Sequence, residues 1–312
     1  MKIKIIVLIT WLLTYCLEGY YCKNQEHLKT TQSGYIQVDN GQLFFQRFGS
    51  GEPVVVLHGG PGMTQDYLLP QMLELAKDHE VIFYDQRGSG KSLDTEINPQ
   101  YINIDRFTED LEQLRLGLGL KKLVLIGHSW GCKFAINYSA KYPDTVSSLI
   151  LLNPGWACNE GKEIYFNEFA KKSEPIKNSL EPFFKYEDFE KLNDQEIYDA
   201  YQMLHSVYFY DTKNLEHLTL KINKTSELHG FKCREMLNSQ SINLFPELKS
   251  LKMPTLIVRG DQDITPEQTV QEIKEAIPNA QLIHLKNCGH FSHVEQPKEL
   301  FSTIRQFLKA TD

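Results

Sequence analysis

The residue types that acyl transfer requires occur along this chain in the order serine, aspartate, histidine. Ser129 lies in the run Gly-His-Ser-Trp-Gly at 127–131, after a short apolar run at 123–126 and before residues with helical spacing. A serine hydroxyl is a poor nucleophile until a tight turn exposes it beside a base, and flanking glycines permit such a turn. This context predicts that Ser129 is a nucleophile rather than part of a plain structural turn.

The acid and base that would activate this serine are expected later in the chain. Asp263 and His290 each follow a short apolar run, so both are expected at the strand ends where Ser129 lies. In such a triad the histidine takes the serine proton, and the aspartate orients the ring and stabilises the imidazolium. We predict Asp263 and His290 for these roles, with Asp261 and His293 as the nearest competitors.

A second glycine-rich run could stabilise the negative charge that develops during acyl transfer. His58-Gly59-Gly60-Pro61-Gly62 follows the apolar run at 53–57. A tetrahedral intermediate carries an oxyanion, which fixed backbone N–H groups must meet. We predict the N–H groups of Gly60 and Trp130 as these donors. The alternative for this run is an ordinary glycine turn.

The elements that must position these residues alternate between strands and helices. Short apolar runs that predict strands buried on both faces lie at 53–57, 80–84, 123–126, 146–152, 255–258 and 281–285. Helical spacing is present at 66–77, 104–120, 133–141, 267–276 and 298–309. A hairpin is expected at 35–48, turning at Asp39-Asn40-Gly41. The pattern predicts an α/β fold with a mostly parallel central sheet flanked by helices, whose ligands bind at the carboxyl ends of the strands.

The alternation stops between 156 and 250. This segment is rich in aromatic and charged residues, has mainly helical spacing and contains no buried-strand run. We interpret it as a helical lid inserted between the two halves of the core, 35–155 and 251–312. An insertion at this point would cover the strand ends that hold the predicted site.

The run Asp85-Gln86-Arg87-Gly88-Ser89-Gly90-Lys91-Ser92 ends like a phosphate-binding loop. That motif has a glycine at the position that Asp85 occupies, so nucleotide binding is not expected. We interpret the run as a shaped loop at the end of a strand, held by an ion pair between Asp85 and Arg87.

The beginning of the chain has the pattern of a secretory signal. Lys2 and Lys4 precede an almost unbroken apolar run at 5–13, which is short for a membrane-spanning helix. We predict a signal peptide at 1–22 and a secreted or cell-envelope location, with no stable membrane span in the mature chain. An uncleaved anchor and lipid attachment at Cys16 are the alternatives.

Composition argues against several other classes of partner. The net charge is −7 and no basic patch is visible, which argues against nucleic-acid binding. The cysteines of the predicted mature chain are Cys132, Cys158, Cys233 and Cys288. Their wide, irregular spacing does not predict a zinc site, and neither a metal nor a cofactor is expected. Export would permit disulfides in any of three pairings, although Cys132 is expected to be a free buried thiol.

Taken together, these motifs resemble those of the α/β-hydrolase superfamily over residues 35–310. The runs at 58–62, 85–92, 127–131, 260–266 and 288–297 are similar to those of its proline iminopeptidase branch. The resemblance implies cleavage of an N-terminal residue, often proline, without a cofactor. It also implies that carboxylates of the lid hold the free amine of the substrate.

The predicted lid departs from that branch. It lacks the Trp-x-x-Trp-Glu run that iminopeptidases tend to carry, and Trp156 is its only tryptophan. Its glutamates include Glu160, Glu163, Glu168 and Glu235. The sequence does not decide which of them, if any, meets an amine, so strict proline specificity does not follow.

The sequence therefore predicts a secreted serine hydrolase that acts on small amides or esters through an acyl-enzyme. An aminopeptidase of the iminopeptidase type is the leading candidate. A carboxylesterase or lactonase with the same triad is the first alternative, and its pocket is expected to be apolar without a carboxylate facing the serine. A non-catalytic binding protein on the same fold is the second.

Overall fold

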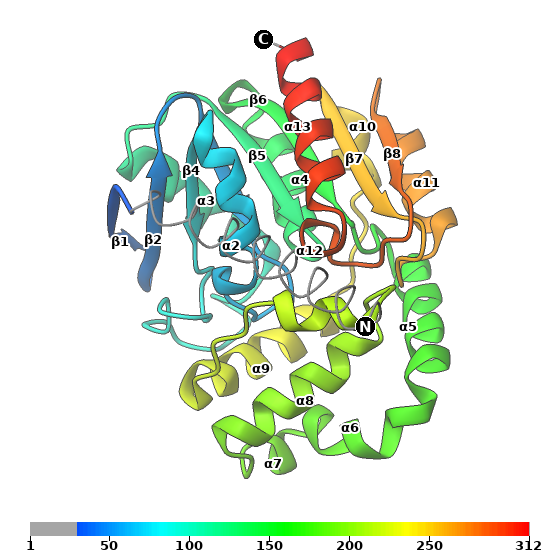
Figure 1. The fold of residues 1–312 in the computed structure, drawn as a ribbon. Coiled ribbons are helices and arrows are strands. Elements are labelled where there is room, and N and C mark those ends of the chain that lie inside the picture. Colours follow the sequence, from blue (N-terminus) through cyan, green and yellow to red (C-terminus); the bar gives the residue numbers. More distant parts are fainter. Residues whose placement is uncertain (1–29, 312) are drawn as a thin grey trace, which may run out of the picture.

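The computed structural model describes residues 30–311, in which an eight-stranded sheet is flanked by helices and further helices gather at one end of it (Figure 1). The predicted signal peptide at 1–22, with its anchor and Cys16 alternatives, lies outside these residues. Within the range described, no helix is both long enough and apolar enough to cross a membrane.

The sheet confirms the predicted mostly parallel architecture. Its order is β1-β2-β4-β3-β5-β6-β7-β8, and only the pairings of β2 with β1 and β4 are antiparallel. The strands are β1 (Gln32–Val38), β2 (Gly41–Gly49), β3 (Pro53–Leu57), β4 (Glu80–Tyr84), β5 (Leu123–His128), β6 (Val146–Leu152), β7 (Thr255–Gly260) and β8 (Gln281–Leu285). Each predicted apolar run forms one of these strands, and the predicted hairpin forms β1 and β2.

Burial on both faces explains why the parallel strands are continuous apolar runs. In β3, Val55 and Leu57 pack into the core on one face of the sheet, while Val54 and Val56 pack on the other. All four are almost completely buried. Because no face meets water, alternation between polar and apolar residues is absent. Each such side chain contributes roughly 1.5–3 kcal/mol to the free energy of unfolding.

Helices cover both faces of the sheet. The flanking helices are α3 (Ile104–Gly117), α4 (Gly131–Lys141), α11 (Glu267–Ala276), α12 (Ser292–Glu295) and α13 (Pro297–Thr311). The single helix predicted at 66–77 is instead divided into a 3₁₀ turn at Gln65–Tyr67, α2 (Leu69–Met72) and a second 3₁₀ segment at Leu73–Lys77. Pro70 has no N–H to continue a preceding helical turn, which explains the division.

The segment between β6 and β7 supplies the helices at the carboxyl ends of the parallel strands (Figure 1). The inserted helices are α5 (Asn159–Ser173), α6 (Lys177–Phe184), α7 (Tyr186–Phe189), α8 (Asp194–Ser206) and α9 (Lys224–Ser239). Of these, α6 to α9 share a small apolar core that includes Phe183, Phe189 and Phe231. The last helix of the segment, α10 (Phe245–Ser250), packs on α4 and α11 instead.

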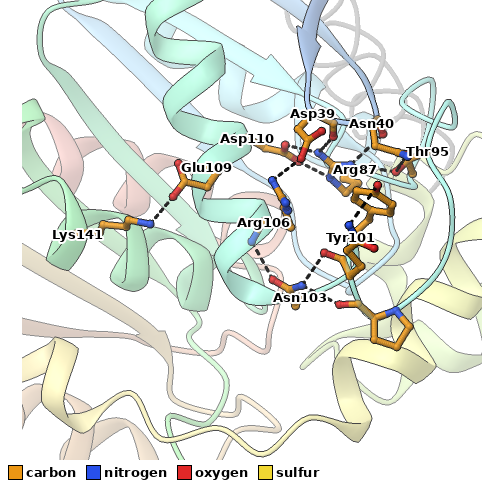
Figure 2. A network of polar contacts seen from close by, with 12 residues as sticks. Asp39, Asn40, Arg87, Thr95, Tyr101, Asn103, Arg106, Glu109, Asp110 and Lys141 are labelled. Atoms are coloured by element: carbon orange, nitrogen blue, oxygen red, sulfur yellow. Dashed lines mark hydrogen bonds and ion pairs between the residues drawn. The ribbon is translucent and has the colours of Figure 1, made fainter.

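The loop after β4 is held by a buried ion pair that the sequence did not predict (Figure 2). Arg87 donates from Nε to Asp110 Oδ2 at 2.8 Å and from Nη2 to Asp110 Oδ1 at 2.6 Å. Its guanidinium also donates to the backbone oxygens of Asp39 and Asn40, at 2.7 and 3.0 Å. This bidentate arrangement ties the loop to α3 and to the turn between β1 and β2.

The predicted ion pair between Asp85 and Arg87 is therefore wrong. The Asp85 carboxylate accepts the backbone N–H groups of Gln65 and Lys91 at 3.1 and 2.9 Å. The short Asp85 side chain reaches only nearby backbone N–H groups, whereas the longer Arg87 side chain extends to Asp110 on α3. Burial raises the pKa of Asp85 to about 6, and the two N–H donors oppose this rise.

Asp110→Asn is expected to lower the free energy of unfolding by about 3 kcal/mol or more, because it leaves the buried Arg87 charge without its partner. Urea denaturation measures this change. Asp39→Asn is the matched control, since it removes an ion pair with Arg106 whose side chains are 31% and 63% exposed. The control is expected to cost less than about 1 kcal/mol. Equal losses in the two variants would contradict the structural importance of the buried pair.

Candidate active site

Ser129 occupies a sharp turn between β5 and α4. Its φ of 54° lies in the left-handed region, which is strained for a serine. The turn is possible because glycines lie on both sides of it. A Cβ on Gly127 would lie 2.8 Å from the Cα of Cys132, and one on Gly131 would lie 2.5 Å from the carbonyl oxygen of Leu57. The sequence thus folds into a turn that projects the Ser129 side chain away from the sheet.

The structure brings the three predicted triad residues into one hydrogen-bonded chain. His290 Nε2 lies 2.8 Å from Ser129 Oγ, and His290 Nδ1 lies 2.8 Å from Asp263 Oδ1. An ionised carboxylate only accepts hydrogen bonds, so Nδ1 carries the proton and Nε2 accepts the one from the Ser129 hydroxyl. The imidazole is thereby oriented as a base toward the serine.

The two competitors from the sequence have other partners. Asp261 accepts the backbone N–H of Cys288 at 3.3 Å. His293 Nε2 lies 3.2 Å from the backbone oxygen of Tyr67. Neither side chain makes a hydrogen bond with Ser129 or His290 in the part of the chain that the structure describes.

Asp263 is buried and accepts hydrogen bonds on both oxygens. Asn153 Nδ2 donates to its Oδ2 at 2.8 Å, and the N–H of Thr265 donates to its Oδ1 at 3.0 Å. Burial opposes the charge, but His290 and these donors outweigh it and hold the pKa of Asp263 below its ordinary value. Sequence reasoning missed Asn153, whose position directly after β6, beside the other strand ends, was the available signal.

A second hydrogen-bonded chain connects the glycine-rich loop after β3 to the histidine loop. The N–H of Gly59 donates to the hydroxyl of Tyr67 at 2.7 Å, and that hydroxyl lies 2.7 Å from His128 Nδ1. His128 Nε2 lies 2.9 Å from the carbonyl oxygen of His290. Since a carbonyl only accepts, Nε2 carries the proton and Tyr67 donates to Nδ1. His128 thus supports the His290 loop.

The predicted oxyanion donors both line the cavity beside Ser129. The loop that contains Gly60 lies against the serine, because a Cβ on Gly59 would be 2.9 Å from the Ser129 Cβ. Trp130 lies at the start of α4. Among the described residues, neither the Gly60 nor the Trp130 N–H donates to a protein acceptor. Both are therefore available to an oxygen bound next to the serine.

Ser129 and His290 open into a cavity of about 310 Å³ between the sheet and the inserted helices. Aromatic side chains form most of its wall: Tyr67, Trp130, Trp156, Tyr165, Phe166, Phe169, Phe183, Phe184, Tyr201, Tyr208, Phe231 and Phe291. The inserted helices also contribute one arginine and one glutamate to the described cavity wall, namely Arg234 and Glu235 on α9. Of the four glutamates considered from the sequence, Glu235 is the one among the described lining residues.

Glu295 joins the inserted segment to the loop that carries His290. Its Oε1 accepts the N–H of Gly289, and its Oε2 accepts that of Tyr210, both at 2.8 Å. The N–H of His290 itself donates to the carbonyl oxygen of Tyr208 at 2.8 Å. The position of the base therefore depends on the segment after α8, a connection that nothing in the local sequence indicated.

The cysteines and potential metal ligands add no second centre in the described residues. The four cysteines there are free, and Cys132 donates from its buried thiol to the carbonyl of Gly127 at 3.1 Å. No group of three or more His, Cys, Asp and Glu side chains between residues 30 and 311 is placed to hold a metal ion.

Residues 52–297 match the family model described as the alpha/beta hydrolase fold, and the chain belongs to this family. A proline iminopeptidase from Heyndrickxia coagulans is 28% identical over 289 residues, which cover 89% of this chain and 98% of the relative. These findings confirm the resemblance to proline iminopeptidases and identify the chain as a hydrolase.

Two solved structures show the same fold. The crystal structure of VinJ has a TM-score of 0.72 and 21% identity, covering 91% of this chain and 100% of its own. A thermophilic esterase from Thermogutta terrifontis has a TM-score of 0.62 and 25% identity, covering 90% of this chain and 99% of its own.

Behind the cavity wall, Glu227 is buried on α9 beside Tyr201. The Tyr201 hydroxyl donates to Glu227 Oε2 at 2.7 Å. Burial raises the pKa of Glu227 to about 7, because the apolar surroundings disfavour its charge more than Tyr201 and the nearby Arg234 favour it. The carboxyl therefore holds its proton more tightly in the folded chain than in the unfolded chain.

Because the folded pKa of Glu227 is raised, its contribution to stability is present below the ordinary value of 4.5 and is lost as pH rises through about 7. Relative to Glu227→Gln, the wild-type free energy of unfolding is expected to fall by up to about 3 kcal/mol over this window. Urea denaturation at a series of pH values measures the difference. Glu235→Gln, an exposed change on the same helix, should show no comparable trend. A pH-independent difference for Glu227→Gln would contradict the expectation.

Proposed function

We propose that this hydrolase is a serine aminopeptidase that cleaves small amides of apolar N-terminal residues through an acyl-enzyme. The observation that carries the proposal is the unbroken chain from Asp263 through His290 to Ser129, which opens into the aromatic cavity. The substrate would bind in that cavity with its carbonyl carbon beside the serine oxygen.

The geometry supports a two-step acyl transfer. Ser129 Oγ attacks the carbonyl carbon while His290 Nε2 takes the hydroxyl proton, and the N–H groups of Gly60 and Trp130 meet the oxyanion. Collapse of the intermediate breaks the bond to the leaving amine, which receives the proton from His290. Water then attacks the acyl-enzyme, with His290 again as the base, and releases the acid and the free serine.

Three observations favour an aminopeptidase. The Glu235 carboxylate lines the same cavity as Ser129 and would attract the free amine of a substrate. The Heyndrickxia coagulans relative is named a proline iminopeptidase. The aromatic wall suits an apolar ring or side chain at the N-terminal position.

A carboxylesterase is the second candidate, because most of the cavity wall is aromatic and uncharged. The Thermogutta terrifontis protein of the same fold is named an esterase. A lactonase would use the same triad. The non-catalytic binding protein considered from the sequence is not favoured, because the serine, histidine and aspartate remain in hydrogen-bonding contact.

We also infer export to the cell envelope or beyond it. The support is the basic start of the chain and the apolar run at 5–13. Fractionation of cells that express the full chain, compared with a variant lacking 1–22, tests this inference. Retention of both forms inside the cell would contradict it.

Ser129→Ala is expected to abolish turnover of prolyl 7-amido-4-methylcoumarin and of p-nitrophenyl butyrate, because it removes the nucleophile. A rate loss of about 10⁴-fold or more is expected from the behaviour of such triads. Ser89→Ala, in the loop after β4, serves as the matched serine control and should keep most of the activity. Turnover that survives Ser129→Ala would contradict the mechanism.

Glu235→Gln distinguishes the two candidate functions. If Glu235 binds the substrate amine, the variant should raise KM for aminoacyl amides roughly tenfold, the scale expected for loss of a charge-assisted contact. The KM for p-nitrophenyl butyrate, which has no amine, should stay nearly constant. Steady-state kinetics on both substrates measure the split. An unchanged KM for the amides would contradict the role of Glu235, and turnover of the ester alone would favour the esterase.

A further inference from the structure

We propose that Arg234 is a specificity-determining residue that binds a carboxylate of the substrate in the catalytic cavity. The proposal rests on the proposed function and adds the chemical class of the substrate to it. The substrate would be a small amide or ester that carries an anionic carboxyl group as well as the bond to be cleaved.

The first observation is that Arg234 forms no ion pair with an acidic side chain of the described residues. It projects from α9 and lines the cavity that also contains Ser129 and His290. Within residues 30–311 its guanidinium forms no ion pair. The Tyr201 hydroxyl is a hydrogen-bonding neighbour, but Nη2 is buried without a partner. A guanidinium carries five N–H donors and always remains charged. Its position in a cavity wall without an anionic partner is therefore costly unless a ligand supplies one.

The second observation is that apolar contacts hold this guanidinium in place. Its Cζ lies 5.5 Å from the centre of the Phe183 ring and 5.1 Å from that of Phe231. Cation–π contacts engage the face of a guanidinium and leave its N–H edges free. A planar fork fixed in this way is suited to two parallel hydrogen bonds to a carboxylate.

The neighbouring acidic groups do not neutralise Arg234 by direct contact. Glu227 is occupied by the Tyr201 hydroxyl, and burial raises its pKa to about 7, so much of it is uncharged near neutral pH. Glu235 is exposed and follows Arg234 directly on the helix, where successive side chains point about 100° apart. In the described structure, neither carboxylate forms an ion pair with the arginine.

These positions give the cavity two separate charged groups, the Glu235 carboxylate and the Arg234 guanidinium. A short peptide with a free amine and a free carboxylate presents the complementary pair. The carboxylate could belong to the leaving group, as in a dipeptide, or to the acyl group, as in a monoester of a dicarboxylic acid. The chemistry that Arg234 recognises is the same in both cases.

The first test measures kcat/KM for two matched substrate pairs with purified full-length protein. Prolyl-phenylalanine and prolyl-phenylalaninamide differ by a carboxylate on the leaving group. Mono-p-nitrophenyl glutarate and p-nitrophenyl butyrate differ by a carboxylate on the acyl group. Wild type is expected to prefer the carboxylate member of one pair by about tenfold or more, which is the range of a charged hydrogen bond. The pair that shows this preference tells whether Arg234 binds a carboxylate on the leaving group or on the acyl group.

Arg234→Gln should abolish that preference and change kcat/KM for the neutral member less than about threefold, while Arg234→Lys should keep part of the preference. Lys232→Gln removes an exposed charge on the same helix and is the control, expected to keep the preference. Equal kcat/KM within both pairs for wild type would overturn the proposal. So would an equal loss for both members in Arg234→Gln, which indicates a structural role.

A binding experiment needs no turnover and therefore separates this proposal from the proposed hydrolysis. Calorimetry is expected to show 3-phenylpropanoate binding wild type about tenfold more tightly than 3-phenylpropanamide, with the difference lost in Arg234→Gln. Equal affinities in wild type would overturn the role of Arg234. Tight carboxylate binding without turnover of any substrate would support Arg234 and contradict the hydrolytic function instead.

Discussion

The left-handed backbone at Ser129 is the constraint on which the site depends. A serine in this conformation is strained, and the surrounding packing must hold it there. Gly127 and Gly131 permit it, because a Cβ at either position would collide with backbone atoms of α4 or of β3. The turn exposes the hydroxyl at the end of the central strand β5. It also leads into α4 at Trp130, so the candidate nucleophile and one candidate oxyanion donor belong to the same local turn.

The His290 imidazole, the candidate base, is held from several directions rather than by Asp263 alone. Asp263 fixes the proton on His290 Nδ1, and His128 Nε2 donates to the carbonyl oxygen of His290. The N–H of His290 donates to the carbonyl oxygen of Tyr208. Glu295 adds contacts to both the histidine loop and the segment after α8. These partners come from the sheet and from the inserted segment. A change in the packing of either would therefore shift the His290 imidazole. The arrangement gives a physical reason for the inserted helices to affect the chemistry and not only substrate entry.

In the proposed function, chemistry and selectivity come from different parts of the fold. The reacting groups lie at strand ends and in the loops that follow them, where the parallel sheet brings distant segments together. The aromatic wall and its charged side chains come largely from α5 to α9. A rigid sheet can therefore keep one reaction geometry while changes in the inserted helices alter which substrates bind. The positions of Arg234 and Glu235 on one helix illustrate how few residues are needed to add charge recognition to an otherwise apolar cavity.

The sequence determined the strands, the turn at Ser129 and the identity of Asp263 and His290 as candidates, because each depends on neighbours within a few residues. Apolar runs form strands wherever both faces are covered, and the glycines of 127–131 mark the turn directly. Only the tertiary structure decided that Arg87 pairs with Asp110, that Asn153 supports Asp263 and that Arg234 faces the cavity. These partners are far apart in the chain, and nothing in their local sequence specifies which distant group each one meets. Packing of the inserted helices on the strand ends makes that choice.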